Sequence, residues 1–66
     1  MNAYYIDLTR ETILKAIEHL SRTQQYMVQA EELESDYEYI GKIIAKLIKE
    51  HNILGGYLLS GLATRK

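Results

Sequence analysis

Two apolar stripes with heptad spacing constrain this chain more than any other feature of its sequence. The first runs from Ile13 to Glu31 and the second from Tyr37 to Leu54, in steps that alternate between three and four residues. Such spacing places each stripe on one side of a helix and is typical of helices that pack lengthwise. The pattern predicts an all-α fold built as an antiparallel two-helix hairpin, with residues 1–66 as one small domain.

The first helix is expected to span residues 9–33, where neither proline nor glycine interrupts the chain. Thr9 suits its N-cap, because a threonine oxygen can accept a hydrogen bond from the amides of the first turn. Leu8 can pack on Ile13 as a hydrophobic staple. Residues 1–7 are therefore expected to form an N-terminal arm that is extended or disordered.

The second helix is expected to span residues 36–53. Ser35 and Glu38 have the spacing of a capping box, in which each side chain bonds an amide of the first turn. A break is expected near Gly55, because each glycine inside a helix costs about 1 kcal/mol. Residues 56–63 then form either a short C-terminal helix or an extension of the second helix.

A domain of 66 residues buries only about 60% of its unfolded surface, so this chain is marginally stable unless a further interaction stabilises it. It contains no cysteine and two histidines, so neither disulfides nor a structural metal site can stabilise it. We therefore expect two hairpins to pair as a homodimer, a four-helix-type bundle. The candidate dimer seam is Ile13, Ile17, Leu20, Gln24, Met27, Ile40, Ile44, Leu47 and His51.

Two members of this seam are polar. Gln24 either meets its symmetry mate across a dimer axis and fixes the register, or lies solvated at the rim. His51 is expected to be a partly buried histidine near a helix C-terminus, where a cation suits the helix dipole. The alternative is a pH-sensitive interface residue.

The charges are unevenly spread. The net charge is −1, but residues 1–40 carry −5 and residues 41–66 carry +4. The acidic residues around the predicted turn form either a solvated tip or a knob that docks on a partner protein. The candidates for docking are Glu32, Glu34 and Asp36. The basic residues are either a solvated helix face or a nucleic-acid contact. The candidates for that contact are Lys42, Lys46, Lys49, Arg65 and Lys66.

Six tyrosines are the chain's only aromatic residues. Tyrosine combines a large apolar ring with a polar tip and is enriched at protein interfaces. Tyr37 belongs to the second stripe and is expected in the core. The others mark a protein-interaction surface if they are exposed together, or cover the core if the chain ends fold back. These candidates are Tyr4, Tyr5, Tyr26, Tyr39 and Tyr57.

No sequence motif indicates an enzyme. The chain contains no nucleophile elbow, phosphate-binding glycine loop or dinucleotide fingerprint, so we expect no catalytic residue and no cofactor. Its histidines lack the spacing of a helical metal pair. The longest apolar run, residues 53–63, is shorter than the about 20 residues of a membrane span. The start lacks the features of a secretory signal, which favours a cytoplasmic protein without membrane contact.

These observations favour a small protein-interaction module, such as a regulator, adaptor or inhibitor, that works as a homodimer. The first alternative is a nucleic-acid-binding regulator that uses the lysine face of a helical dimer. The second alternative is a structural subunit of a larger assembly, suggested by the apolar segment near the C-terminus.

Overall fold

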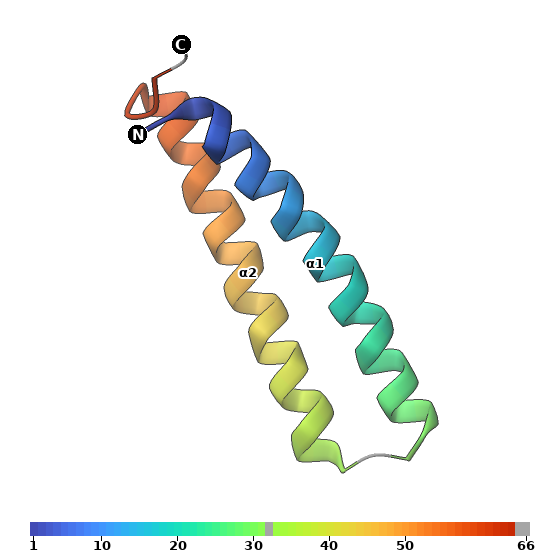
Figure 1. Cartoon of the computed structure of the whole chain (residues 1–66). Helices are drawn as coiled ribbons and strands as arrows, with labels where there is room; N and C mark the ends of the chain where they lie inside the picture. Colours follow the sequence, from blue (N-terminus) through green and yellow to red (C-terminus); the bar gives the residue numbers. More distant parts are fainter. Residues whose placement is uncertain (32, 65–66) are drawn as a thin grey trace.

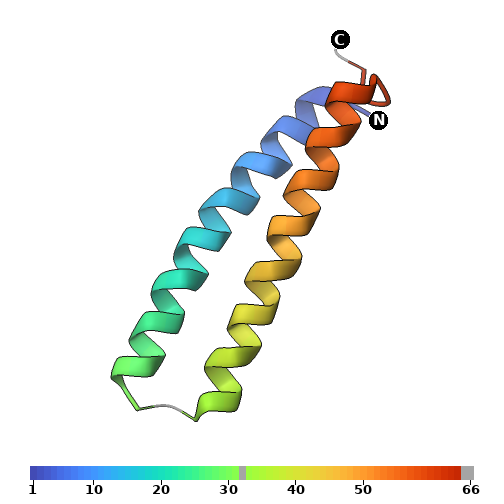
Figure 2. The same ribbon diagram turned by 180° about the vertical axis from the view of Figure 1, so that it is seen from behind.

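The computed structural model describes residues 1–31 and 33–64 and shows two antiparallel α-helices joined by a short turn (Figure 1). Helix α1 spans Ala3–Gln29 and helix α2 spans Glu34–Ser60. The view from behind shows the helices side by side along their whole length, with the start of α1 and the end of α2 at the same end of the hairpin (Figure 2). The predicted all-α hairpin is confirmed.

Helix α1 begins nearly two turns earlier than predicted. The Asn2 side chain caps it, since its Oδ1 accepts hydrogen bonds from the amides of Tyr4 at 2.9 Å and Tyr5 at 3.4 Å. The prediction of an extended or disordered arm over residues 1–7 is wrong. Ala3 and Ile6 are among the most buried residues described, so packing against α2 extends the helix to the chain's start.

Other predicted features of α1 are also corrected. Thr9 is not an N-cap, because it lies inside α1 and its hydroxyl donates to the carbonyl of Tyr5 at 2.7 Å. The helix ends at Gln29 rather than at residue 33. Glu31 follows with φ 59°, the left-handed conformation that reverses the chain direction after a helix.

Helix α2 begins without the predicted capping box. It starts at Glu34, its N-cap residue is Leu33, and no side-chain hydrogen bond caps it. Ser35 is therefore inside the first turn. Glu34 and Asp36 place two carboxylates there, where the helix dipole favours negative charge.

Helix α2 continues through Gly55 and Gly56 to Ser60, so the predicted break near Gly55 is wrong. Of the two expectations for residues 56–63, the structure shows the extension, up to Ser60. The helix ends where Gly61 adopts φ 79°, a conformation that glycine reaches without the steric cost of a Cβ atom.

Residues 61–64 fold back on the start of α1 at the open end of the hairpin. The amide of Ala3 donates to the carbonyl of Thr64 at 2.8 Å, and the amide of Thr64 donates to the carbonyl of Met1 at 2.7 Å. These bonds form an isolated parallel bridge between Asn2 and Thr64. The first residues of α1 are thereby held against the last turn of α2.

Two side chains of α1 reach across the hairpin to backbone carbonyls of α2. Arg10 Nε donates to the carbonyl of His51 at 3.2 Å, and Gln24 Nε2 donates to the carbonyl of Tyr37 at 2.8 Å. A glycine lies four residues after each accepting residue, at Gly55 and Gly41. A Cβ atom at Gly55 would lie 2.9 Å from Arg10 Nη2, and one at Gly41 would lie 2.9 Å from Gln24 Nε2.

These glycines expose the carbonyl of the preceding turn to the crossing side chain. The two bridges lie two heptads apart on both helices and set the register of the hairpin. In this register Gln24 serves the contact between α1 and α2 of one chain, and its amide nitrogen is engaged there.

We expect opposite effects from alanine at two adjacent glycines. Gly56→Ala should stabilise the fold by about 1 kcal/mol, since a Cβ atom there would meet nothing within 4 Å and alanine is the better helix former. Gly55→Ala should lose that gain, because its Cβ displaces the Arg10 guanidinium from the His51 carbonyl. Urea unfolding followed by circular dichroism measures both changes.

The control is the Arg10→Ala background, in which Gly55→Ala should become as stabilising as Gly56→Ala. Equal stabilisation by the two alanines in the native background would contradict the role assigned to Gly55.

Candidate interaction surface

The hairpin buries little of its apolar surface. Among the described residues, the buried hydrophobic side chains are Ala3, Ile6 and Ile13. Large apolar and aromatic side chains are instead exposed along the whole molecule. They are Met1, Tyr4, Tyr5, Leu8, Leu14, Tyr26, Val28, Leu33, Tyr39, Ile48, Ile53, Leu59 and Leu62. Because so much apolar surface is exposed, we expect a functional surface on the outer faces of the hairpin.

The hairpin has two broad faces, one on either side of the plane that contains both helices. In an antiparallel helix pair, the residues one position before each core residue lie on one face, and those one position after lie on the other. We call the first the tyrosine face. Its α1 row is Tyr5, Thr9, Thr12, Ala16, His19, Thr23 and Tyr26. Its α2 row is Asp36, Tyr39, Ile43, Lys46, Glu50, Ile53 and Tyr57.

The α1 row of the tyrosine face contains no carboxylate, lysine or arginine. Its three threonine hydroxyls are engaged inside the helix, where Thr9, Thr12 and Thr23 donate to the carbonyls of Tyr5, Leu8 and His19 at 2.7, 2.8 and 2.9 Å. The hydroxyl donors are therefore satisfied without water. Despite its threonines, this row is suited to burial against a protein surface.

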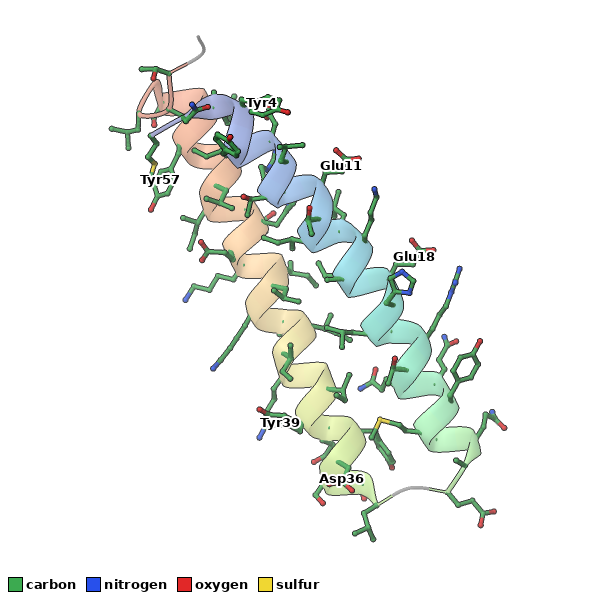
Figure 3. The ribbon with its side chains drawn as sticks, viewed as in Figure 1. Tyr4, Glu11, Glu18, Asp36, Tyr39 and Tyr57 are labelled. Carbon is green, nitrogen blue, oxygen red and sulfur yellow. The ribbon has the colours of Figure 1, made fainter. Side chains whose placement is uncertain are left out.

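The α2 row of the tyrosine face is mixed. Ile43 and Tyr57 are half-buried, whereas Tyr39 and Ile53 are exposed. Figure 3 shows Tyr39 and Tyr57 on the side of α2 that is turned away from α1. Lys46 and Glu50 are also exposed and lie one helical turn apart near the middle of the row. This row offers apolar contacts towards its ends and opposite charges at its centre.

The opposite face is more highly charged on α1. Leu14, Val28 and Ile48 are exposed there, but the α1 row also includes Asp7, Glu11 and Glu18. Figure 3 shows Glu11 and Glu18 projecting from α1 away from α2.

Two of these carboxylates form ion pairs within α1. Glu11 pairs with Lys15 at 3.5 Å and Glu18 with Arg22 at 3.0 Å, and all four side chains are largely exposed. Exposed pairs of this kind add little stability, about 0.5 kcal/mol each. They do make the surface polar, so this edge of α1 is better suited to water than to an apolar interface.

Two shallow hollows lie near the turn. One, of about 240 Å³, is lined by Thr23, Tyr26, Met27 and Ala30, so it opens beside the α1 row of the tyrosine face. The other, of about 310 Å³, is lined by Gln24, Gln25, Val28, Gln29 and Tyr37. Neither lining includes a histidine or a carboxylate.

The predicted interaction tyrosines are at the surface. Tyr4, Tyr5, Tyr26 and Tyr39 are exposed and Tyr57 is half-buried. The rings of Tyr4 and Tyr5 pack edge to face with centroids 5.2 Å apart. Tyr4 does not belong to the rows of the tyrosine face.

The charged candidates are also exposed where they are described. These are Glu34, Asp36, Lys42, Lys46 and Lys49. Glu32, Arg65 and Lys66 lie outside the described residues.

The predicted dimer seam lies between the two helices of one chain. Ile13 is buried, and the other seam residues, Ile17, Leu20, Gln24, Met27, Ile40, Ile44, Leu47 and His51, are half-buried. Neither Arg10 nor the threonine row was predicted from the sequence. The signal for the row was present as a second series with heptad spacing, one position before the apolar stripe.

Within residues 1–31 and 33–64, no group of three or more metal-ligating side chains gathers. In the same part of the chain, no helix is long and apolar enough to cross a membrane. No protein-family model, curated protein or solved structure matches the chain.

Proposed function

We propose that this protein is a small non-enzymatic interaction module that works as a homodimer and binds another protein through its outer surface. The observation that carries the proposal is the imbalance between its core and its surface. Three hydrophobic residues are buried among those described, whereas thirteen large apolar or aromatic side chains are exposed. Exposed apolar surface on this scale is typical of proteins that associate.

A dimer of hairpins would keep one broad face of each copy accessible to a different protein. The two broad faces differ in charge, so one can pair with a second copy while the other remains accessible. The acidic residues beside the turn, among them Glu34 and Asp36, are exposed and would attract a basic partner surface. The proposal therefore assigns self-pairing and partner binding to different parts of the hairpin.

Thermal unfolding at several protein concentrations tests the dimer. If folding and pairing are coupled, Tm should rise by about 5 °C for each tenfold increase in concentration, because mass action favours the dimer. A Tm that stays constant over a hundredfold range of concentration would contradict the homodimer.

Nucleic-acid binding is the second candidate function, and one observation favours it. Lys42, Lys46 and Lys49 are exposed on α2, and no ion pair engages them within the described residues. Fluorescence anisotropy with random-sequence DNA and RNA at low salt tests this candidate. Binding should weaken steeply with salt, and Lys42→Glu with Lys49→Glu should abolish it. Absence of binding at low salt would rule this function out.

A further inference from the structure

We infer that the tyrosine face is covered by a second copy of the same chain, which lies antiparallel across a two-fold axis near the middle of both helices. This inference rests on the proposed homodimer and adds which face pairs and in which register. A two-fold interface is self-complementary, so each residue must suit the residue that the symmetry places opposite it. The tyrosine face meets that requirement in the sizes of its α1 side chains, and its charged groups have partners within reach.

The size pattern of the α1 row is self-complementary about its centre, between Ala16 and His19. Antiparallel pairing about that point brings His19 opposite the partner's Ala16, and Tyr26 opposite the partner's Thr9. Thr12 lies opposite the partner's Thr23. Each ring of the row thus faces a small side chain, which is the arrangement that lets two helices approach closely.

The same register accounts for the hollow beside this row. Tyr5 lies opposite the partner's Ala30, which lines the 240 Å³ hollow together with Thr23, Tyr26 and Met27. Tyr5 is exposed on its own chain, with its ring held against that of Tyr4. The hollow and the projecting ring therefore lie at matching positions on the two copies, although they are at opposite ends of one hairpin.

In this register each charged group of the α2 row has an opposite charge or a hydrogen-bond donor of the partner within reach. The register of the hairpin places the two-fold axis near residues 46 and 47 of α2. The two copies of Lys46 then face each other beside the axis, and the partner's Glu50 lies about one helical turn away, so each lysine can turn from its symmetry mate to that carboxylate. Asp36 lies opposite the partner's Tyr57, whose hydroxyl can donate to the carboxylate. The charged groups on this row therefore have partners when the face is covered.

The available area is sufficient for a stable pair. The backbone of the hairpin measures 48 Å by 15 Å across its broad face, and the axis lies near its centre, so nearly the full length overlaps. The projected area of this face is about 700 Å². A standard protein interface buries about 800 Å² of surface on each partner, which is of similar size. The opposite face is less suited to a second copy, because its α1 row carries three carboxylates where the α1 row of the tyrosine face has none, and antiparallel pairing about its centre would bring the two copies of Glu18 near each other.

Disulfide trapping tests the face and the register together, and it is clean because the chain has no cysteine of its own. The variant carries Thr12→Cys and Thr23→Cys, two exposed positions that face each other only between copies. Within one chain they are eleven residues apart, about 16 Å, which is too far for a disulfide. Mild oxidation should give a covalent dimer that reducing agent dissolves.

Two control variants make the result specific. Leu14→Cys with Gln25→Cys has the same spacing and places two exposed cysteines on the opposite face. This variant should cross-link about 100-fold more slowly at about 10 μM protein, because its thiols lack the millimolar effective concentration that pairing of the copies gives. Thr12→Cys alone should not cross-link, whereas a parallel dimer would bring the two copies of this cysteine together.

The outcomes separate this inference from the proposed function. Rapid cross-linking of the Thr12 and Thr23 pair alone would support both. A native dimer in sedimentation that cross-links through the opposite face, or through the single Thr12 cysteine, would overturn this inference and leave the homodimer in place. A monomer at all concentrations would overturn both.

Discussion

Ile13→Ala should destabilise the hairpin by about 3 kcal/mol, a large part of the total stability of so small a domain. Ile13 is 9% exposed and is one of three buried hydrophobic residues among those described. The loss combines the transfer free energy of the removed methyl and methylene groups with the cost of the cavity that they leave. Urea unfolding followed by circular dichroism measures the change.

Leu14→Ala is the matched control, one position further along the same helix. Leu14 is 53% exposed and projects on the face opposite the tyrosine face, so its truncation should change the free energy of unfolding by less than about 0.5 kcal/mol. If the two variants were equally destabilised, the packing described between α1 and α2 would be incorrect.

Ala16→Arg should raise the dissociation constant of the dimer at least about 100-fold, which corresponds to about 2.7 kcal/mol. Ala16 lies at the proposed two-fold axis opposite the partner's His19, where an arginine has no room and brings a second positive charge near Lys46. Arginine is a good helix former, so the monomer should keep its helical content. Sedimentation equilibrium measures the dissociation constant.

Ser21→Arg provides the comparison for this variant. Ser21 is also a small, half-buried residue of α1, but it lies on the opposite face. Its substitution should leave the dissociation constant within about threefold of the native value. A larger effect from Ser21→Arg than from Ala16→Arg would show that the chain dimerises through the face opposite the tyrosine face.

The heptad stripes were sufficient to predict the class of fold and the pairing of the two helices. The periodicity of residues such as Ile17 and Leu47 reports directly which side of each helix is buried. It does not report where a helix ends, because end positions depend on contacts from elsewhere in the chain. The start at Ala3 needs the Asn2 cap and the return of Thr64, which is far away in sequence.

The two internal glycines illustrate the same limit. Read locally, Gly55 suggests the end of a helix, since glycine disfavours helix interiors. In the structure it provides the space through which Arg10 reaches the His51 carbonyl. Gly41 does the same for Gln24, whose role in the contact between the helices was not predicted.

The candidate surface was predictable only in part. The excess of tyrosine indicated an interaction surface, and the structure shows the predicted tyrosines at or near the surface. Their division between faces could not be assigned before the register of the helices was known. The threonine row has a polar composition, and its suitability for burial depends on the hydroxyl bonds of Thr9, Thr12 and Thr23 to their own helix.

Sedimentation equilibrium of the native chain over a wide range of protein concentration is the decisive test of the homodimer. We expect a reversible equilibrium that reaches twice the chain mass of 7.7 kDa, with the dimer weakened by Ala16→Arg and unaffected by Ser21→Arg. A folded protein that remains at 7.7 kDa at the highest concentration would contradict the homodimer and the pairing of its tyrosine face.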